Sequence, residues 1–223
     1  MGIRGYSGQL FGKVIPLGDE MHIHEIFWSV QGEGLRSGHP SIFVRTTGCT
    51  LQCPYCDTRD SWVTGTKMKV EQIILEIEKY KEMYPQCQVV LTGGEPLEQD
   101  LSEMVSRLKQ KKFFLSIETN GIYFQSLDID WWTVSPKDIA DFYIAADLHE
   151  KIDEVKCIVN QNLTLDVLER IRAIRTDFPI FLQPDFFNPN KYQDTLELYE
   201  QCQKVAIPGV RLGIQLQHIL DIR

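Results

Sequence analysis

The sequence predicts an α/β fold with parallel strands, in the form of a partial (β/α) barrel of about six strands. Two observations lead to this prediction. Short apolar runs alternate with segments whose apolar residues recur at helical spacing, and only three or four of these segments make good helices. The chain has 223 residues, fewer than the ~250 of a complete eight-unit barrel. A doubly wound sheet is the alternative, and either fold places chemistry at the carboxyl ends of the strands.

The first half of the chain contains two expected strand–helix pairs. The apolar run 42–44 predicts a strand. A helix is expected to begin at Val70, because apolar residues recur every three or four positions up to Tyr84, and Pro85 ends it. Residues 89–92 predict a second, buried strand. A second helix follows, with an apolar face formed by Leu97, Leu101, Met104, Val105 and Leu108.

The second half of the chain continues the alternation. Strands are predicted over 113–117, 131–135, 155–159, 180–182 and 210–215. Asn162 or Thr164 provides an N-cap for a helix whose apolar positions are Leu165, Leu168 and Ile171. A last helix is predicted from the spacing of Tyr192, Leu196 and Tyr199. We expect residues 1–20 to be an N-terminal extension and 21–223 to form a single domain.

Composition excludes several classes of protein. With 43% apolar and 24% charged residues, the chain is neither collagen-like nor disordered. A formal net charge of −8 argues against a nucleic-acid partner. No apolar run approaches the ~18 residues of a transmembrane helix, so no membrane association is expected. The first 20 residues lack the apolar core of a signal peptide, which predicts a cytoplasmic location.

Three of the six cysteines, Cys49, Cys53 and Cys56, lie within eight residues, directly after the first predicted strand. A structural zinc site needs four ligands, and this loop contains no fourth Cys or His. Three thiolates suit a [4Fe–4S] cluster with one iron left open for a small molecule. Disulfides are improbable in a cytosolic protein, so the remaining cysteines are expected to be core or surface thiols: Cys87, Cys157 and Cys202.

A glycine-rich turn, Gly93-Gly94-Glu95, follows the strand at 89–92. Paired glycines let the backbone approach a ligand closely and expose its N–H and C=O groups. Two later strand ends carry polar groups that could contact the same ligand. They are Ser135-Pro136-Lys137 and Gln183-Pro184-Asp185.

The Cys-x3-Cys-x2-Cys loop resembles the signature of the radical S-adenosylmethionine (SAM) superfamily. The resemblance implies a [4Fe–4S] cluster bound by the three cysteines, with SAM at the open iron. The radical would then come from the cluster and SAM, so no catalytic side chain is expected and the histidines are taken as structural or surface residues. The SAM contacts that the resemblance implies are Tyr55, Asp57, Gly94, Glu95, Ser135, Pro136, Lys137, Gln183, Pro184 and Asp185.

Residues 25–34, together with 43–45 and 56–58, resemble the 7-carboxy-7-deazaguanine synthase family, and the likeness extends over 21–223. That family contracts the ring of 6-carboxy-5,6,7,8-tetrahydropterin and releases ammonia on the route to queuosine; SAM is re-formed as a cofactor. The resemblance implies that Thr58 gives a hydroxyl to Mg2+, which prefers oxygen ligands. The implied substrate contacts are Val30, Gln31, Gly32, Glu33, Arg45, Thr92 and Arg223.

The resemblance also implies a homodimer and a one-electron reductant such as flavodoxin. Gln217-His218 departs from the Gln-x-His-Lys pattern of many family members, which leaves the role of these two residues open. Two other functions compete with this reading. One is an activase of a glycyl radical enzyme, which carries the same cysteine spacing. The other is a zinc-binding interaction module without catalysis.

Overall fold

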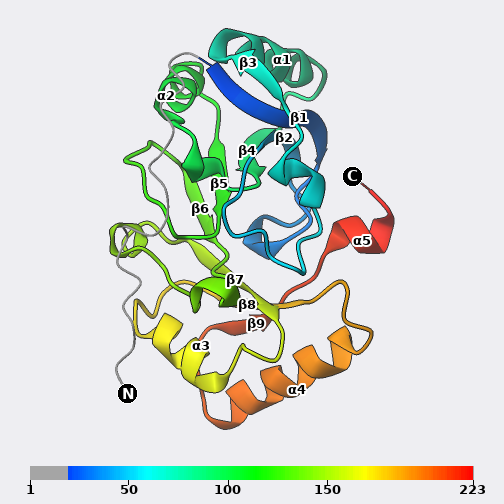
Figure 1. The fold of residues 1–223 in the computed structure, drawn as a ribbon, viewed down its shortest axis with the longest axis vertical. Helices are drawn as coiled ribbons and strands as arrows, with labels where there is room; N and C mark the ends of the chain where they lie inside the picture. The colour runs from blue at the N-terminus through cyan, green and yellow to red at the C-terminus, as the bar shows by residue number, and fades with distance from the viewer. Residues whose placement is uncertain (1–19, 223) are drawn as a thin grey trace.

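In the computed structural model, which describes residues 20–222, nine strands form one sheet (Figure 1). Its strand order is β3-β1-β2-β4-β5-β6-β7-β8-β9. The strands are β1 Glu20–Val30, β2 Pro40–Thr46, β3 Thr66–Lys69, β4 Gln88–Gly93, β5 Leu115–Thr119, β6 Trp131–Val134, β7 Glu154–Val159, β8 Ile180–Pro184 and β9 Val210–Leu212.

All strands from β2 to β9 in that order run parallel, whereas β1 pairs antiparallel with β2, and β3 antiparallel with β1. The predicted α/β fold with a largely parallel sheet is therefore confirmed. β1 and β3 add an antiparallel edge that the sequence pattern does not predict. Within the described residues β3 and β9 are the two edges, so the sheet is open, as in a partial barrel. The expected extension over 1–20 lies outside the described residues except for Glu20, and the single domain over 21–223 stays a prediction.

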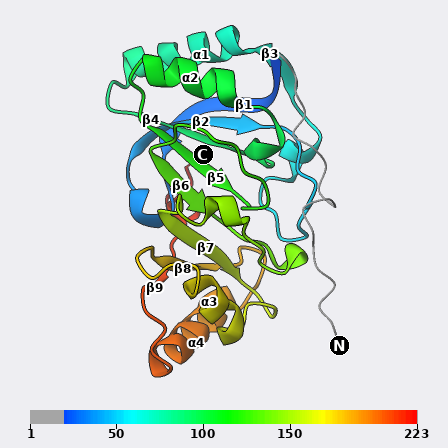
Figure 2. The ribbon, with the colours of Figure 1, turned by 90° about the vertical axis from the view of Figure 1, so that its left-hand side faces the viewer.

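Five α-helices accompany the sheet in the described part of the chain: α1 Val70–Met83, α2 Ser102–Gln110, α3 Leu165–Arg172, α4 Lys191–Lys204 and α5 Leu216–Leu220. Helices α1 and α2 pack together over β1–β5, while α3 and α4 lie against β7–β9 (Figure 2). The connection from β5 to β6 contains no helix, and the connection from β6 to β7 contains only two 3-10 helices, Asp138–Ala140 and Ala146–Leu148. Four of the five helices correspond to predicted ones, and Thr164 caps α3 by accepting a hydrogen bond from the Val167 amide.

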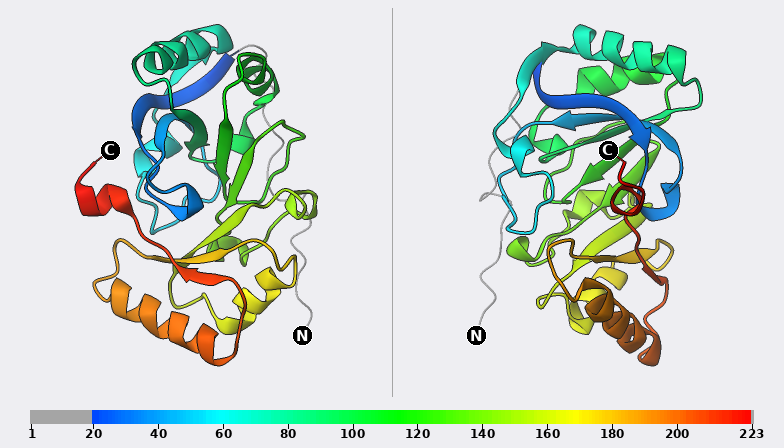
Figure 3. Two further views of the ribbon diagram at one scale, coloured as in Figure 1. Left: turned by 180° about the vertical axis from the view of Figure 1, so that it is seen from behind. Right: turned by 90° about the vertical axis from the view of Figure 1, so that its right-hand side faces the viewer.

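Several predicted elements have different bounds; the strand predicted over 113–117, for example, is β5, Leu115–Thr119. Two of the differences have a structural reason. The second helix begins at Ser102, because the Gln125 side chain accepts from the Leu101 amide (3.1 Å) and donates to the Leu97 carbonyl (3.1 Å). A side chain from a distant loop thus takes backbone groups that a longer helix would use. The last strand ends at Leu212, and the chain then forms α5 beside the loop that follows β1 (Figure 3).

The two faces of the sheet differ in chemistry, because successive side chains of a strand point to opposite sides. The face covered by helices is apolar and fully buried, with Ile42, Val44, Val89, Leu91, Leu115 and Ile117 at its centre. The residues at the alternate positions of these strands point to the opposite face, which carries Arg45, Thr92, Glu118 and Lys156. No helix described here has the length and apolar content needed to cross a membrane.

Candidate active site

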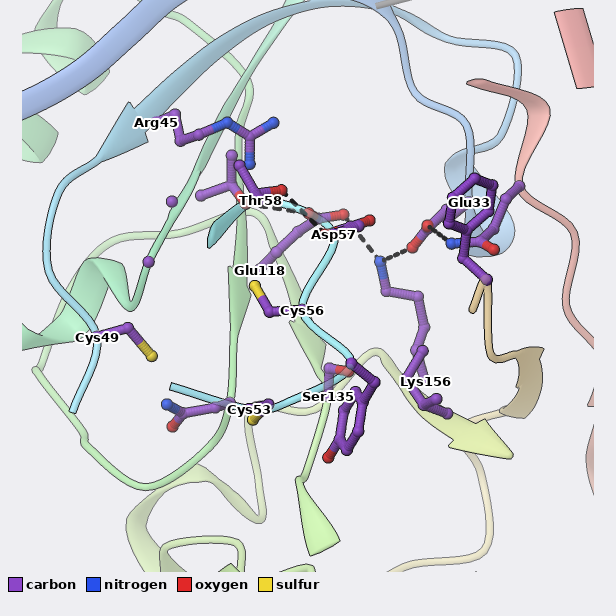
Figure 4. Close-up of a pocket in the computed structure, with 18 of the residues that line it drawn as sticks. Glu33, Arg45, Cys49, Cys53, Cys56, Asp57, Thr58, Glu118, Ser135 and Lys156 are labelled. Atoms are coloured by element: carbon purple, nitrogen blue, oxygen red, sulfur yellow. Dashed lines mark hydrogen bonds and ion pairs between the residues drawn. The ribbon is translucent and has the colours of Figure 1, made fainter. Parts of the chain in front are cut away.

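A cavity opens at the carboxyl ends of the parallel strands and collects most of the predicted site residues (Figure 4). The predicted residues that line it are Val30, Gln31, Gly32, Glu33, Arg45, Cys49, Cys53, Tyr55, Cys56, Asp57, Thr58, Thr92, Gly94, Glu95, Ser135, Lys137, Pro184 and Asp185. Pro136 and Gln183 are not among the lining residues. Arg223 lies outside the described residues.

The cysteine loop brings three sulfur atoms to one end of this cavity, where they face a common space (Figure 4). A turn closes between Cys53 and Cys56, whose backbone N–H donates to the Cys53 carbonyl (3.0 Å). Burial raises the pKa of Cys49 to about 11 and also raises that of Cys53. Buried thiols of this kind ionise when a bound cation compensates the thiolate, so the loop suits an iron centre.

The three thiols could each bind a different iron of a cluster. Within residues 20–222, no three His, Cys, Asp or Glu side chains converge closely enough to hold one metal ion. In an iron–sulfur cluster each thiolate binds an iron of its own, so the sulfurs need not meet at one point. The arrangement around the shared space is therefore compatible with a [4Fe–4S] cluster.

The glycine turn after β4 packs against the cysteine loop. The Gly94 N–H donates to the Thr46 carbonyl (3.0 Å), and the Glu95 N–H donates to the Gly48 carbonyl (2.7 Å). A Cβ atom on Gly94 would lie 2.0 Å from the Gly48 oxygen and 3.1 Å from the Cys49 Cβ. Glycine is thus required at position 94 for the two loops to approach each other, whatever else the turn contacts.

The buried Glu95 carboxylate holds the end of β5 in place. It accepts hydrogen bonds from the Leu97 N–H (3.0 Å), the Thr119 hydroxyl (2.7 Å) and the Asn120 N–H (2.7 Å). Burial outweighs these donors and raises the pKa of Glu95 to about 7. Asn120 also lines the cavity, and its buried Nδ2 has no hydrogen-bond partner among residues 20–222. This donor suits an acceptor on a bound cofactor, and only the position of Asn120 after a predicted strand could have indicated it.

Two polar contacts organise the cavity rim near Cys53. The Tyr55 hydroxyl donates to Asp138, which also accepts from the amides of Asn160 (2.9 Å) and Asn162 (2.8 Å). The Lys137 ammonium donates to the Ser135 hydroxyl (2.7 Å). The contact with Asp138 fixes the Tyr55 ring at the end of the cysteine loop. Lys137 places a positive charge near the same loop.

The other end of the cavity contains a buried charge network that the sequence reading missed. The Lys156 Nζ lies 2.6 Å from Glu33 Oε2 and 3.0 Å from Glu118 Oε1. Burial opposes the charge on Lys156, but Glu118 and Glu33 outweigh it and raise its pKa. Burial likewise opposes the charge on Glu33, and Lys156 nonetheless lowers the pKa of Glu33 to about 2. This end of the cavity is therefore ionic at neutral pH.

Neutral side chains complete the network around Glu118. Gln31 Nε2 donates to Glu118 Oε1 (3.1 Å), and the Thr92 hydroxyl donates to Oε2 (3.2 Å). A signal for Glu118 and Lys156 was present in the sequence, because each interrupts an apolar strand. Charged residues are rarely buried without a partner, so two such positions on different strands predict a pair.

Two further predicted residues line the same region. Arg45 donates from Nε to Glu25 Oε1 (2.9 Å), and its guanidinium carbon lies 5.8 Å from the Phe27 ring centroid. The Thr58 hydroxyl donates to Asp57 Oδ1 (2.9 Å), which places a hydroxyl and a carboxylate side by side.

The C-terminal segment forms one wall of the cavity. Gln215 and Gln217 donate to Glu33 Oε1 (3.1 and 2.8 Å). The Leu216 N–H donates to the Gly32 carbonyl (3.0 Å), and a Cβ on Gly32 would lie 1.9 Å from Gln217 Oε1. Gln217, whose role the sequence left open, therefore contacts the loop at 31–33.

Comparison with known proteins gives consistent matches. Residues 43–214 match the family described as the radical SAM superfamily. The chain is 36% identical to the 7-carboxy-7-deazaguanine synthase of Bacteroides thetaiotaomicron, over 90% of this chain and 98% of that protein. It is 39% identical to the enzyme of the same name from Hyperthermus butylicus, over 92% and 97%. A crystal structure of QueE from Escherichia coli superposes with a TM-score of 0.72 at 27% identity, covering 88% of this chain and 94% of that one.

Proposed function

Because the chain belongs to the radical SAM superfamily and, within it, to the 7-carboxy-7-deazaguanine synthases, we propose that it converts 6-carboxy-5,6,7,8-tetrahydropterin to 7-carboxy-7-deazaguanine and ammonia. The supporting observation is that one cavity contains three cysteine thiols at one end and a polar, charged pocket at the other. A redox cofactor and a small polar substrate can thus meet in a single cavity.

Cys49, Cys53 and Cys56 are the residues that would hold the [4Fe–4S] cluster. When bound, the cluster and SAM supply the radical chemistry that starts the reaction. The protein contributes a fixed loop, because Gly94 and Glu95 tie the cysteine segment to the end of β4.

The residues proposed to bind SAM surround the cysteine loop. The Lys137 ammonium and the Ser135 hydroxyl could bind the carboxylate or ribose of SAM, and the Asn120 amide adds an unpaired donor. The Tyr55 ring, fixed through Asp138, would shield the cofactor from water. Glu95 acts mainly by holding Thr119 and Asn120, since its carboxylate oxygens are engaged with protein donors.

The substrate would occupy the end of the cavity that contains Arg45, Thr92 and the loop at 30–33. A guanidinium is a planar donor pair that matches a carboxylate, so Arg45 is assigned to the pterin carboxylate. The Glu25 contact orients Arg45 for that purpose. Thr58 is proposed to bind Mg2+ through its hydroxyl, with the substrate and water as the other ligands.

Two further properties are proposed from the family resemblance. A one-electron reductant such as flavodoxin would supply the reducing electron, and the active form would be a homodimer. Light scattering of the purified protein tests the second of these directly.

Anaerobic incubation of the iron-loaded protein with the pterin, SAM, a reductant and Mg2+ tests the proposed function. Formation of 7-carboxy-7-deazaguanine supports it. If the protein cleaves SAM but leaves the pterin unchanged, the chain is a radical SAM protein with another substrate. If it binds one zinc and no iron, the radical assignment itself fails.

A further inference from the structure

Lys156 is a buried cation in the middle of the proposed substrate pocket, and no step described so far uses it. Resting on the proposed function, we propose that Lys156 is a positioning residue. It orients the Glu118 carboxylate toward the cavity, so that Glu118 accepts a hydrogen bond from a ring N–H of the reduced pterin. Lys156 would thereby help the enzyme to distinguish the tetrahydropterin from the aromatic pterin.

Donors from three different segments of the chain orient Glu118. Lys156 on β7 and Gln31 after β1 donate to Oε1, and Thr92 on β4 donates to Oε2. The side chain of Glu118 nevertheless keeps 23% of its surface exposed, and Glu118 lines the cavity. A carboxylate has about four acceptor positions, so one remains for a ligand after these three donors are bound.

The contacts around Lys156 leave one of the neighbouring carboxylates available for that ligand. Glu33, Glu118 and Glu154 are the charged groups that act on Lys156. Glu154 accepts from the Leu35 N–H (2.7 Å) and the Thr133 hydroxyl (2.8 Å). Glu33 is engaged by Lys156, Gln215 and Gln217. Glu118 has two neutral donors and shares Lys156 with Glu33, so it is the carboxylate left to interact with the substrate.

The two oxidation states of the pterin present different groups to the Glu118 carboxylate. In a tetrahydropterin the nitrogens of the reduced ring carry hydrogen, whereas in the aromatic pterin the same nitrogens are acceptors. An ionised carboxylate accepts from the first and repels the second, because two acceptors then face each other in a buried site. A Glu118 carboxylate that is turned away from the ring would lose this preference.

Removing Lys156 should therefore remove a donor that orients the Glu118 carboxylate. In Lys156→Met, Glu33 and Glu118 would share a buried region without a cation, and one of them would take up a proton more readily. We expect KM for the tetrahydropterin to rise about tenfold or more near neutral pH. The size of the increase should vary with pH, because Lys156 is the cation that lowers the pKa of Glu33 in the same network.

Two additional variants separate charge from packing. Lys156→Arg keeps the cation and should recover part of the wild-type KM. Lys156→Met combined with Glu33→Gln removes the competing carboxylate, so its KM should be lower than that of Lys156→Met alone. Lys111→Met is the matched control, because Lys111 is an exposed lysine paired only with Glu78 in the described contacts.

The experiment measures kcat and KM against pH in the iron-loaded variants, together with equilibrium binding of the tetrahydropterin and of aromatic 6-carboxypterin. The proposal is supported if Lys156→Met has a higher KM and a smaller preference for the tetrahydropterin over the aromatic pterin, and if Lys156→Arg restores part of both. An unchanged binding ratio and an unchanged pH profile in Lys156→Met overturn it. If Lys156→Met does not fold, the double variant Lys156→Met, Glu33→Gln is compared with Glu33→Gln alone. The binding ratio and the pH profile are again the two measurements that decide.

Failure of the proposed function would look different. A wild-type protein that binds both pterins but converts neither contradicts the proposed reaction, and its binding ratio still tests Lys156. A wild-type protein that converts the tetrahydropterin while Lys156→Met binds both rings as the wild type does contradicts only the role of Lys156.

Discussion

The N–H of Glu95 donates to the carbonyl of Gly48 across 2.7 Å, and this contact joins the glycine turn after β4 to the loop that carries the cysteines. The two segments are 47 positions apart in the sequence, yet the parallel pairing of β2 with β4 brings their ends together. The geometry of the proposed cluster site therefore depends on the sheet as well as on the cysteines.

Gly94→Ala should lower the iron content of the protein. The new methyl group would meet the Gly48 oxygen at 2.0 Å, so the cysteine loop must move, at a cost of about 1–3 kcal/mol. Iron and sulfide analysis after anaerobic reconstitution measures the effect. Gly38→Ala is the control, because Gly38 has a positive φ of 88° but a Cβ there would meet no atom of the described residues within 4 Å. Equal iron content in the two variants would contradict the packing argument.

Cys53→Ala should abolish both the cluster absorbance and SAM cleavage, because two remaining thiolates cannot hold the cluster in the loop. Cys202→Ala serves as the comparison, since Cys202 is a buried thiol on α4, outside the cavity. The assignment of the cluster ligands is wrong if Cys53→Ala retains both properties.

Thr58→Ala should weaken the response of the activity to Mg2+ and leave the cluster intact. The loss of one oxygen ligand should raise the Mg2+ concentration for half-maximal activity by about tenfold or more. Thr58→Ser, which keeps the hydroxyl, should behave like the wild type. A titration that is identical for Thr58→Ala and the wild type removes Thr58 from the metal site.

Glu95 should make the iron-free protein less stable as the pH rises. Its pKa is about 7 in the folded chain and near 4.5 when unfolded, so between these values the folded state binds more protons. Stability must then fall from pH ~4.5 to ~7. In Glu95→Gln this contribution is absent. The free energy of unfolding, measured with urea, should therefore fall less between about pH 5 and pH 7.5 than it does in the wild type. Equal losses would mean that Glu95 does not titrate in this range.

Sequence patterns predicted the parts of the fold that depend on local periodicity. The apolar runs correspond to buried strands such as β4, and Thr164 caps α3 as the N-cap preference indicates. The start of α2 could not be predicted in this way, because the Gln125 side chain from a later loop determines it. The antiparallel edge formed by β1 and β3 likewise depends on pairing between distant segments.

The residues of the proposed site also fall into those that local sequence motifs predict and those that depend on tertiary contacts. The cysteine loop and the Gly-Gly-Glu turn are contiguous motifs, so their residues could be found one segment at a time. The contact of Lys156 with Glu33 and Glu118 joins three segments, and each charge looks isolated in its own strand or loop. The interrupted apolar strands could have indicated a pair of buried charges, but the partners of each charge follow only from the strand register, which places the side chains on one face.

The stoichiometry of the reaction tests the central claim most directly. Iron-loaded protein should be incubated anaerobically with the tetrahydropterin, SAM, reductant and Mg2+, and the product, ammonia and remaining SAM should be measured together. The proposed function predicts equal amounts of 7-carboxy-7-deazaguanine and ammonia, formed over many turnovers without matching consumption of SAM. Cleavage of SAM with no ring-contracted product and no ammonia would contradict it.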